Sequence, residues 1–475
     1  MPLPDHKTKI VATIGPASDT PEMLERIIRA GMNVARLNFS HGDFSGHAGS
    51  IARIRAAEKA TGRRVAIMAD LPGPKMRIGK LDPEPINLKP GDSFTLTTEE
   101  IIGSAQKVSV SFEKLPAVVK PGDRLFLNDG LVQLKVERVV GNDVACSVLV
   151  GGELRSRKGL NLPGINLGIS AFTDHDRACL KFALENGVDA VSQSFVESEA
   201  DIEAVRKAAA ELGRSSLFII AKVERTGALE RYDDILKAAD GIMVARGDLG
   251  VEVPIEEIAI TQKRLIAKAN VAGKPVITAT QMLESMVASR LPTRAEATDV
   301  ANAILDGTDC VMLSAESAMG RYPEEAVGML ARIAASTETH RPPARLKYLQ
   351  QSIHEHTATS VAEGIASVVE HALETASACA VIVPTHSGTT ARMISRFKPV
   401  PWIVAASHDE RVCQGLQFSY GVTPIHLAED PEDWRVFATE WVRKNSIHGS
   451  LAVLVAGPSQ KNPDANHRIE FLRLG

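Results

Sequence analysis

Eight short apolar runs, separated by amphipathic stretches, recur along the chain up to residue 317, and this alternation limits the possible folds more than any other feature. It is typical of β–α units whose strands pair in a parallel sheet. The segment TPEMLERIIRAG carries helix signals, with Thr20 as N-cap, Pro21 in the first turn and Gly31 as C-cap. Eight such units predict an α/β fold, a (β/α)8 TIM barrel. We expect its strands at 9–15, 33–40, 64–70, 189–196, 217–224, 241–248, 275–281 and 310–317.

Polar side chains follow seven of these runs where each run ends. Barrel enzymes build their active sites from the carboxyl ends of the strands. One polar strand end is ordinary, but seven together predict a shared pocket. The polar residues at these seven strand ends are Arg36, Asn38, Ser40, Asp70, Ser194, Lys222, Glu224, Arg246, Asp248, Thr280, Gln281, Ser314 and Glu316. The tripeptide Arg246-Gly247-Asp248 is therefore expected in that pocket, and a cell-adhesion role is disfavoured.

The spacing between the third and fourth runs is far too long for one helix and its loops. Its sequence alternates at period two and is broken by Pro-Gly, Asn-Asp-Gly and Gly-Asn turns, which predicts a small antiparallel β domain. Residues 71–74 and 159–164 are expected to form its hinge, and closure of such a lid excludes water. After the Pro-rich segment THRPPARLKY, a further α/β domain is predicted. The expected domains are a barrel (1–73 and 172–338), an inserted lid (74–171) and a C-terminal regulatory domain (339–475).

Composition narrows the class of function. The net charge of −4 and pI of about 6.4 argue against a nucleic-acid binder. No apolar run is long enough for a membrane helix, and the N-terminal segment does not resemble a signal peptide, so a cytoplasmic protein is expected. The five scattered cysteines suggest neither a disulfide framework nor a zinc site.

Two carboxylates at neighbouring strand ends, Glu224 and Asp248, can act as acid and base or hold a hard cation. Mg2+ typically takes one or two protein carboxylates. Lys222 lies two residues before Glu224 and points the same way, and with Arg36 and Arg77 it would form a cradle for an anion such as a phosphate ester. A purely structural network of salt bridges is the alternative. Neither a Walker A motif nor G-x-G-x-x-G occurs.

Six segments together resemble the pyruvate kinase family: TKIVATIGPAS, GMNVARLNFSHG, KGLNLPG, DGIMVARGDLGVEVP, GKPVITATQMLESM and PTRAEATDVANAILDGTDCVMLSAESAMGRYP. The resemblance implies transfer of the phosphoryl group of phosphoenolpyruvate to ADP, giving pyruvate and ATP in the final step of glycolysis. It also implies Mg2+ or Mn2+ as cofactor and a homotetramer. A metal–enolate lyase or aldolase and a non-catalytic sensor are the competing functions. The lyase would have no reason to keep the lid, and the sensor would be expected to lose a metal ligand.

The resemblance also implies roles for particular residues. Glu224 and Asp248 match the ligands of the divalent ion, Lys222 and Arg36 contact the transferred phosphoryl group, and Thr280 lies where the enolate carbon is protonated. Phosphoryl transfer depends mainly on positioning and charge neutralisation. Substrate binding is assigned to Gly247, Asp248, Thr280 and Lys222, with the carboxylate seated on backbone N–H groups at the turn. Nucleotide binding is assigned to Arg77, Lys158, His41 and Pro16, although Met319 replaces a lysine that the family usually has near the nucleotide.

A monovalent-cation site is implied around Asn38, Ser40, Asp70 and Ser194. Most members carry Thr at the position of Leu71 and Glu at that of Lys75. Leu71, Lys75 and Ile78 instead resemble the bacterial-type members that do not need potassium, and an ammonium group can replace a bound K+. We therefore expect K+ not to be required. The alternative is that Lys75 is a solvated lysine in a hinge loop.

The segment PTHSGTTARMISRF places hydroxyls and free N–H groups between a strand and a helix start, at Thr385, Ser387, Gly388, Thr389 and Thr390. Such a loop can hold the phosphate of an effector, and in similar pyruvate kinases it does. A simple helix N-cap is the alternative. The family's second effector loop is glycine-rich, whereas the tail AGPSQKNPDANHRIEFLRLG lacks most of those glycines. A monophosphate and fructose 1,6-bisphosphate both stay open as effectors.

Overall fold

The computed structural model describes residues 3–341, 360–457 and 466–474. Eight parallel strands close into a barrel in the order β1-β16-β15-β14-β13-β12-β3-β2, which confirms the predicted TIM barrel. All of these strands except β3 end earlier than predicted, because the last residues of the predicted runs, such as Ser40, Glu224 and Asp248, already belong to the loops and helices that follow. Their bounds are β1 Lys9–Thr13, β2 Met32–Asn38, β3 Ala66–Leu71, β12 Ala190–Gln193, β13 Phe218–Val223, β14 Gly241–Ala245, β15 Val276–Ala279 and β16 Cys310–Leu313.

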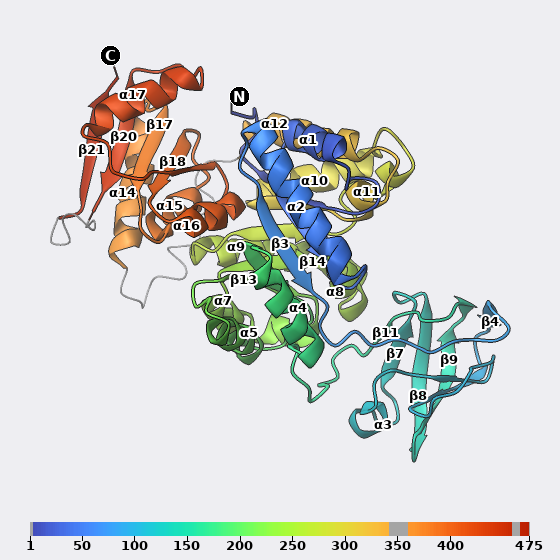
Figure 1. Cartoon of the computed structure of the whole chain (residues 1–475). Helices are drawn as coiled ribbons and strands as arrows, with labels where there is room; N and C mark the ends of the chain where they lie inside the picture. The colour runs from blue at the N-terminus through green and yellow to red at the C-terminus, as the bar shows by residue number, and fades with distance from the viewer. Residues whose placement is uncertain (1–2, 342–359, 458–465, 475) are drawn as a thin grey trace.

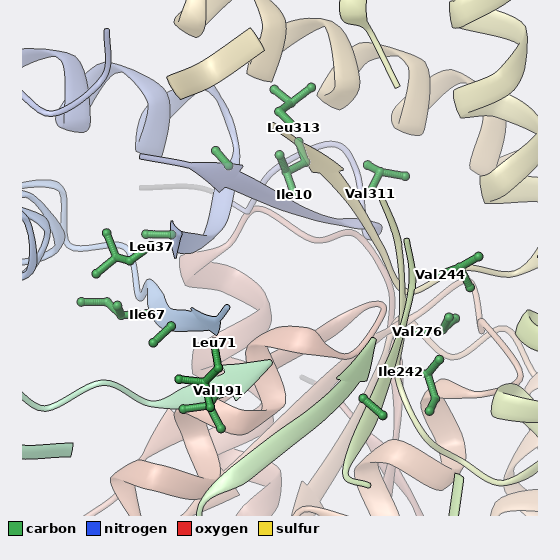
Figure 2. Close-up of a cluster of buried hydrophobic side chains, with 14 of the residues drawn as sticks. Ile10, Leu37, Ile67, Leu71, Val191, Ile242, Val244, Val276, Val311 and Leu313 are labelled. Carbon is green, nitrogen blue, oxygen red and sulfur yellow. The ribbon is translucent and has the colours of Figure 1, made fainter. Parts of the chain in front are cut away.

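Amphipathic helices surround the barrel. In α1 (Pro21–Ala30), the Thr20 side chain accepts a hydrogen bond from the N–H of Met23 at 3.3 Å, and Gly31 ends the helix at φ 129°, as predicted. Apolar side chains on the outer faces of the strands, such as Ile67 and Val244, pack against these helices (Figure 2). The other helices around the barrel are α2 Phe44–Thr61, α4 Asp174–Glu185, α5 Glu199–Glu211, α6 Thr226–Glu230, α7 Tyr232–Ala238, α8 Arg246–Glu252, α9 Ile258–Val271, α10 Arg294–Asp306, α11 Ala315–Ala318 and α12 Pro323–Glu338. Within the described ranges, no helix is long and apolar enough to cross a membrane.

The lid emerges between β3 and α4 and projects from the carboxyl end of the barrel (Figure 1). Its main sheet has the order β11-β7-β8-β9-β5-β6 and is antiparallel, as predicted, except that β5 and β6 pair in parallel. Phe94, Leu134 and Val136 are fully buried in a core of its own. Its elements are β4 Ile86–Leu88, β5 Ser93–Thr97, β6 Lys107–Ser109, α3 Leu115–Val118, β7 Arg124–Leu127, β8 Val132–Val140, β9 Asp143–Val150, β10 Gly152–Leu154 and β11 Leu160–Asn161.

The C-terminal domain is a five-stranded sheet with the order β19-β18-β17-β20-β21, flanked by helices. The four predicted strands are present, and β21 adds an antiparallel edge that was not predicted. Most of the Pro-rich segment and residues 458–465 of the tail lie outside the described residues. The elements are α14 Val361–Thr375, β17 Ala380–Pro384, α15 Thr389–Ser395, β18 Trp402–Ser407, α16 Glu410–Gly415, η4 Leu416–Phe418, β19 Val422–His426, α17 Trp434–Lys444, β20 Leu451–Ala456 and β21 Arg468–Arg473.

An aromatic side chain of the C-terminal domain closes the amino end of the barrel. Phe418 is fully buried and stacks on Phe218 of β13, with ring centroids 5.2 Å apart. It belongs to the same buried cluster as Met243 and Ile277, whose side chains fill the barrel interior. Beside it, Lys9 Nζ donates a hydrogen bond to the carbonyl of Val422 at 2.7 Å. The C-terminal domain therefore contributes Phe418 to the core of the barrel, while its own sheet packs in separate clusters.

Candidate active site

Lys222 is the centre of a buried polar cluster at the carboxyl end of the barrel. Its Nζ donates to Ser194 Oγ at 2.7 Å and lies 2.9 Å from Glu224 Oε1 and 3.3 Å from Asp70. Burial disfavours the ammonium ion, but Asp70 and Glu224 outweigh it and raise the pKa of Lys222 above its ordinary value. Lys222 therefore stays charged although it is almost fully buried.

Arg36 and Asp70 form the second part of the cluster. The two side chains make a buried ion pair, and Arg36 also donates to Thr13 Oγ1 at 2.8 Å. Ser192 donates to the other oxygen of Asp70 at 2.7 Å. Burial would raise the pKa of Asp70, but Lys222 and Arg36 lower it to about 2. Asp70 thus holds both cations in place as a permanent carboxylate.

Glu224 and Asp248 bring two more carboxylates to the same end of the barrel. Glu224 is almost fully buried and accepts a hydrogen bond from the N–H of Phe195 at 2.7 Å, whereas Asp248 is half-buried at the start of α8. Burial raises the pKa of both, and the charge of Asp248 adds to the effect on Glu224, although Lys222 opposes it. Two neighbouring carboxylates that resist ionisation fit a divalent cation, since its charge would offset their burial and repulsion.

The turn around Thr280 connects this cluster to α8. Thr280 Oγ1 accepts a hydrogen bond from the N–H of Gly247 at 2.8 Å, and Thr280 has a φ of 65°. A positive φ is unfavourable for a β-branched residue, and such strain is found at functional sites. Arg246 turns away: its guanidinium donates to the carbonyl of Thr280 at 2.7 Å and pairs with Asp299 at 2.7 Å. The expectation that Arg246 faces the pocket is therefore wrong, because that side chain pins the turn instead.

The predicted nucleotide residues lie at the edge of the pocket and on the lid. Arg77 donates to the carbonyl of Arg157 at 3.0 Å, and the carbonyl of Lys158 accepts from the N–H of Ile78 at 2.9 Å, so the two cations share one lid edge. Partial burial lowers the pKa of His41, and the charges of Lys75 and Arg77 lower it further, which places His41 beside them. Pro16 is exposed, and the nearby Met319 is 69% exposed.

Lys75 is exposed at the first connection to the lid, and none of the described residues forms an ion pair with it. Burial raises the pKa of Asp248, and the charges of Lys222 and then Lys75 oppose that rise, so the charge of Lys75 reaches the site. Asn38 lies beside Asp70 in the β2–β3 register, and its Oδ1 accepts from the N–H of Ser40 at 3.1 Å. The structure thus brings the four predicted monovalent-cation residues to one end of the barrel.

Sequence reasoning missed several contributors to the cluster. Thr13 and Ser192 hold Arg36 and Asp70, and both could have been found by applying the strand-end rule more widely. Asp129, in a lid turn with a φ of 56°, adds to the burial that raises the pKa of Asp248, and its neighbour Gly130 lies beside Val251 of α8. The sequence predicts a turn around Asp129, but how close Asp129 comes to Asp248 depends on where the lid lies. Ser314 and Glu316 serve the fold, since buried Glu316 accepts backbone N–H bonds from Leu283 and Ser314.

A barrel with a buried lysine and arginine, two neighbouring carboxylates and a basic lid edge defines an enzyme for phosphorylated, anionic substrates. Family models agree: "Pyruvate kinase, barrel domain" matches residues 5–327 and "Pyruvate kinase, alpha/beta domain" matches residues 363–467. The chain belongs to the pyruvate kinase family, and it transfers the phosphoryl group of phosphoenolpyruvate to ADP, giving pyruvate and ATP. Membership of this family decides against the two competing functions, a metal–enolate lyase or aldolase and a non-catalytic sensor.

Relatives and a solved structure support the assignment across nearly the whole chain. The pyruvate kinase of Thermococcus litoralis is 51% identical over 433 residues, which is 90% of each chain. The pyruvate kinase of Geobacillus stearothermophilus is 42% identical over 461 residues, which cover 95% of this chain and 78% of that one. A crystal structure of a pyruvate kinase from Cryptosporidium parvum matches with a TM-score of 0.91 at 38% identity, covering 99% of this chain and 97% of that one.

Proposed function

We propose that Lys222 and Arg36 neutralise the phosphoryl group during its transfer. In the reaction, an oxygen of the ADP β-phosphate attacks phosphorus, the bond from phosphorus to the enol oxygen breaks, and the enolate of pyruvate leaves. The negative charge that moves between these oxygens is best stabilised by cations that are already fixed in position before the substrate binds. The supporting observation is that Ser194, Asp70 and Glu224 fix the Lys222 ammonium on three sides.

Glu224 and Asp248 would hold Mg2+ or Mn2+, which pyruvate kinases generally use. When bound, the ion supplies positive charge to the oxygens of the substrate. Thr280 is the residue assigned to the protonation of the enolate carbon that completes pyruvate. Gly247 and Asp248, at the start of α8, are assigned to the carboxylate end of the substrate. The Gly247 N–H already binds Thr280 Oγ1, so substrate would have to share or displace that hydrogen bond.

The metal assignment is tested by titrating Mg2+ against Glu224→Gln and Asp248→Asn. Each change removes one anionic ligand, so we expect the Mg2+ concentration for half-maximal rate to rise by roughly tenfold to a hundredfold, as for altered metal-site residues. Glu256→Gln, which changes an exposed carboxylate just after α8, is the matched control. An unchanged Mg2+ requirement in both site variants would refute the assignment.

We propose that the nucleotides ADP and ATP contact Arg77, Lys158, His41 and Pro16. The basic edge of the lid and the exposed position of His41 support this. Lys75 is proposed to replace a monovalent cation near Asn38, Ser40, Asp70 and Ser194, so that K+ is not required. Lys75 follows β3, the strand that carries Asp70, and its charge opposes the burial that raises the pKa of Asp248, which supports the idea.

The remaining proposals concern regulation, assembly and location. The loop with Thr385, Ser387, Gly388, Thr389 and Thr390 is proposed to bind the phosphate of an effector. A homotetramer in the cytoplasm is proposed from the family. Exposed apolar side chains support an interface: Ile255 (76% exposed) lies in the 3-10 turn before α9 and Ile260 (68% exposed) on α9, and Val361 (63% exposed) and Val368 (57% exposed) lie on α14. Light scattering after size exclusion measures the assembly.

A further inference from the structure

The second connection between lid and barrel runs past a polar cavity beside the active site. The chain leaves β11 at Asn161 and enters α4 at Asp174. Below it lies a cavity of about 330 Å3, lined by Gly164, Ile165, Ser170, Glu197, Arg225 and Glu252, among others. Arg225 and Glu252 are among the charged residues here, and neither had a role in the sequence-based predictions.

Arg225 binds this connection directly. It follows Glu224, is only 5% exposed, and donates to the carbonyl of Ile165 at 2.9 Å and to that of Leu162 at 3.4 Å. The same guanidinium makes an ion pair with Glu197 and lies 3.9 Å from the carboxylate of Glu252. One buried side chain therefore joins the connection to the loop after β12 and to α8.

Glu252 lies beside Arg225 and lines the same cavity as Gly164 and Ile165 of the connection. It is the last residue of α8, and its side chain is only 3% exposed. Burial raises the pKa of Glu252, while Arg225 and backbone hydrogen bonds from Thr226 and Gly164 partly offset that rise. Arg225 thus holds carbonyls of the connection, and Glu252 lies beside that guanidinium and accepts a hydrogen bond from the N–H of Thr226 at 3.3 Å.

The positions of the two residues connect the lid to the metal carboxylates. Arg225 is adjacent in sequence to Glu224, and Glu252 lies one helical turn after Asp248 on the seven-residue helix α8. A shift of residues 162–165 would therefore displace Arg225 and Glu252. These two side chains belong to the elements that carry Glu224 and Asp248. Buried ion pairs often contribute little net stability compared with apolar packing, so precise placement is a better explanation for this pair.

We propose that Arg225 and Glu252 are positioning residues that clamp residues 162–165 and thereby align the lid cations with the nucleotide phosphates. The clamp rests on the proposed roles of Arg77 and Lys158 in nucleotide binding. The first connection has a different anchor, since the N–H of Gly73 donates to Asp176 of α4 at 2.9 Å. Loss of the clamp should therefore loosen one connection and leave the other in place.

The test compares Arg225→Lys and Glu252→Gln with wild type. Arg225→Lys keeps the charge but cannot present the fork of donors that reaches two carbonyls and two carboxylates. We expect the KM for ADP to rise by roughly tenfold to a hundredfold, the scale of effects from small misplacement. Exchange of the methyl protons of pyruvate with D2O, measured without nucleotide, reports on the barrel site, where Thr280 is assigned to the protonation step. It should stay within about twofold of wild type, because neither variant changes a residue assigned to substrate or metal.

Hydrogen–deuterium exchange of the full-length protein provides a direct structural readout. Amides in 160–171 should exchange faster in both variants, and amides in 71–76 should not change. Arg231→Met removes another arginine that lines the same cavity but is exposed, and it is the matched control. Circular dichroism and thermal melting establish that each variant is folded.

Three results would overturn the clamp: an unchanged KM for ADP, unchanged exchange of amides in 160–171, or equal losses in ADP turnover and methyl-proton exchange. Should Arg225→Lys fail to fold, Glu252→Gln alone decides between these outcomes. Lys158→Met tests the underlying proposal separately. A wild-type KM for ADP in that variant would refute the nucleotide role of Lys158, whatever the clamp variants do.

Discussion

Lys222 and Glu224 project from the same end of β13, and the ammonium nitrogen lies 2.9 Å from a carboxylate oxygen. The pair joins the proposed phosphoryl-stabilising group to a proposed metal ligand. Neither side chain can move without disturbing the other, and both are almost fully buried. The cation is therefore held ready for the transferred group before substrate arrives, which reduces the reorganisation needed in the transition state.

Replacing Lys222 by methionine should reduce kcat by roughly a thousandfold or more and change the KM for phosphoenolpyruvate only slightly. The lost charge acts mainly in the transition state. A coupled assay for pyruvate measures both constants. Lys207→Met, at an exposed position on α5, is the control. Turnover near the wild-type rate in Lys222→Met would show that the assigned role is wrong.

The enzyme should be substantially active in buffers free of K+ and NH4+, and either ion should add little. Lys75→Glu should lower activity without K+ and partly restore dependence on it. Two charges about 4 Å apart interact by roughly 1–4 kcal/mol between water-like and surface-like screening, which is enough to order a site. Lys80→Glu makes the same charge change at an exposed lysine of the lid. Wild-type enzyme that stays nearly inactive until K+ is added would contradict this prediction.

A phosphorylated effector should activate or inhibit the enzyme at subsaturating phosphoenolpyruvate. In the free loop, Thr385 Oγ1 accepts from the N–H of Gly388 at 2.9 Å, and the hydroxyls of Ser387 and Thr389 lie 2.9 Å apart. A phosphate could take over these hydrogen bonds, so Ser387→Ala combined with Thr389→Ala should weaken the response. Titrations with several sugar phosphates, fructose 1,6-bisphosphate and AMP measure it. A flat response of wild type to all of them would rule out the effector site.

Lys9 should make stability rise with pH in the alkaline range. Burial, only partly offset by nearby anionic groups, lowers its pKa from 10.5 to about 8. Between these values the folded state has lost a proton that the unfolded state still binds, so unfolding becomes less favourable as pH rises. At about 1.4 kcal/mol per pH unit, the free energy of unfolding should gain roughly 2–3 kcal/mol from pH 8 to 10 relative to Lys9→Met. Urea unfolding of both proteins measures this, and parallel pH profiles would contradict it.

Phe418→Ala should destabilise the barrel as well as the C-terminal domain. Removing a fully buried phenylalanine typically costs about 3–5 kcal/mol, and here the cavity would open between the two domains. Calorimetry should show a lower melting temperature for both domains together. Phe471→Ala, which removes a ring that is 53% exposed, should have a much smaller effect. A normal melting temperature for Phe418→Ala would show that the stacking with Phe218 contributes little.

Local pattern predicted the barrel, the lid and the strand ends that carry Lys222, Glu224 and Asp248. These features follow from periodicity and from turn residues that are close in sequence. The role of Arg246 could not be predicted in the same way, because its partner Asp299 is 53 residues away. The contact of Phe418 with the barrel and that of Arg225 with the lid connection also join residues far apart in the sequence. Each depends on which distant segments meet, and a single sequence does not encode that in any local pattern.

The insertion of the lid also affects the order in which the protein can be built during translation. Strand β3 ends at Leu71, and its neighbour β12 begins only at Ala190, so one edge of the nascent sheet has no partner until the ribosome has made the whole lid. The lid has its own core and can fold in that interval. Once folded, it brings residues 71 and 174 together, which lowers the entropy cost of closing so long a loop. We expect the folded lid to assist closure of the barrel during synthesis, before it has any substrate to enclose.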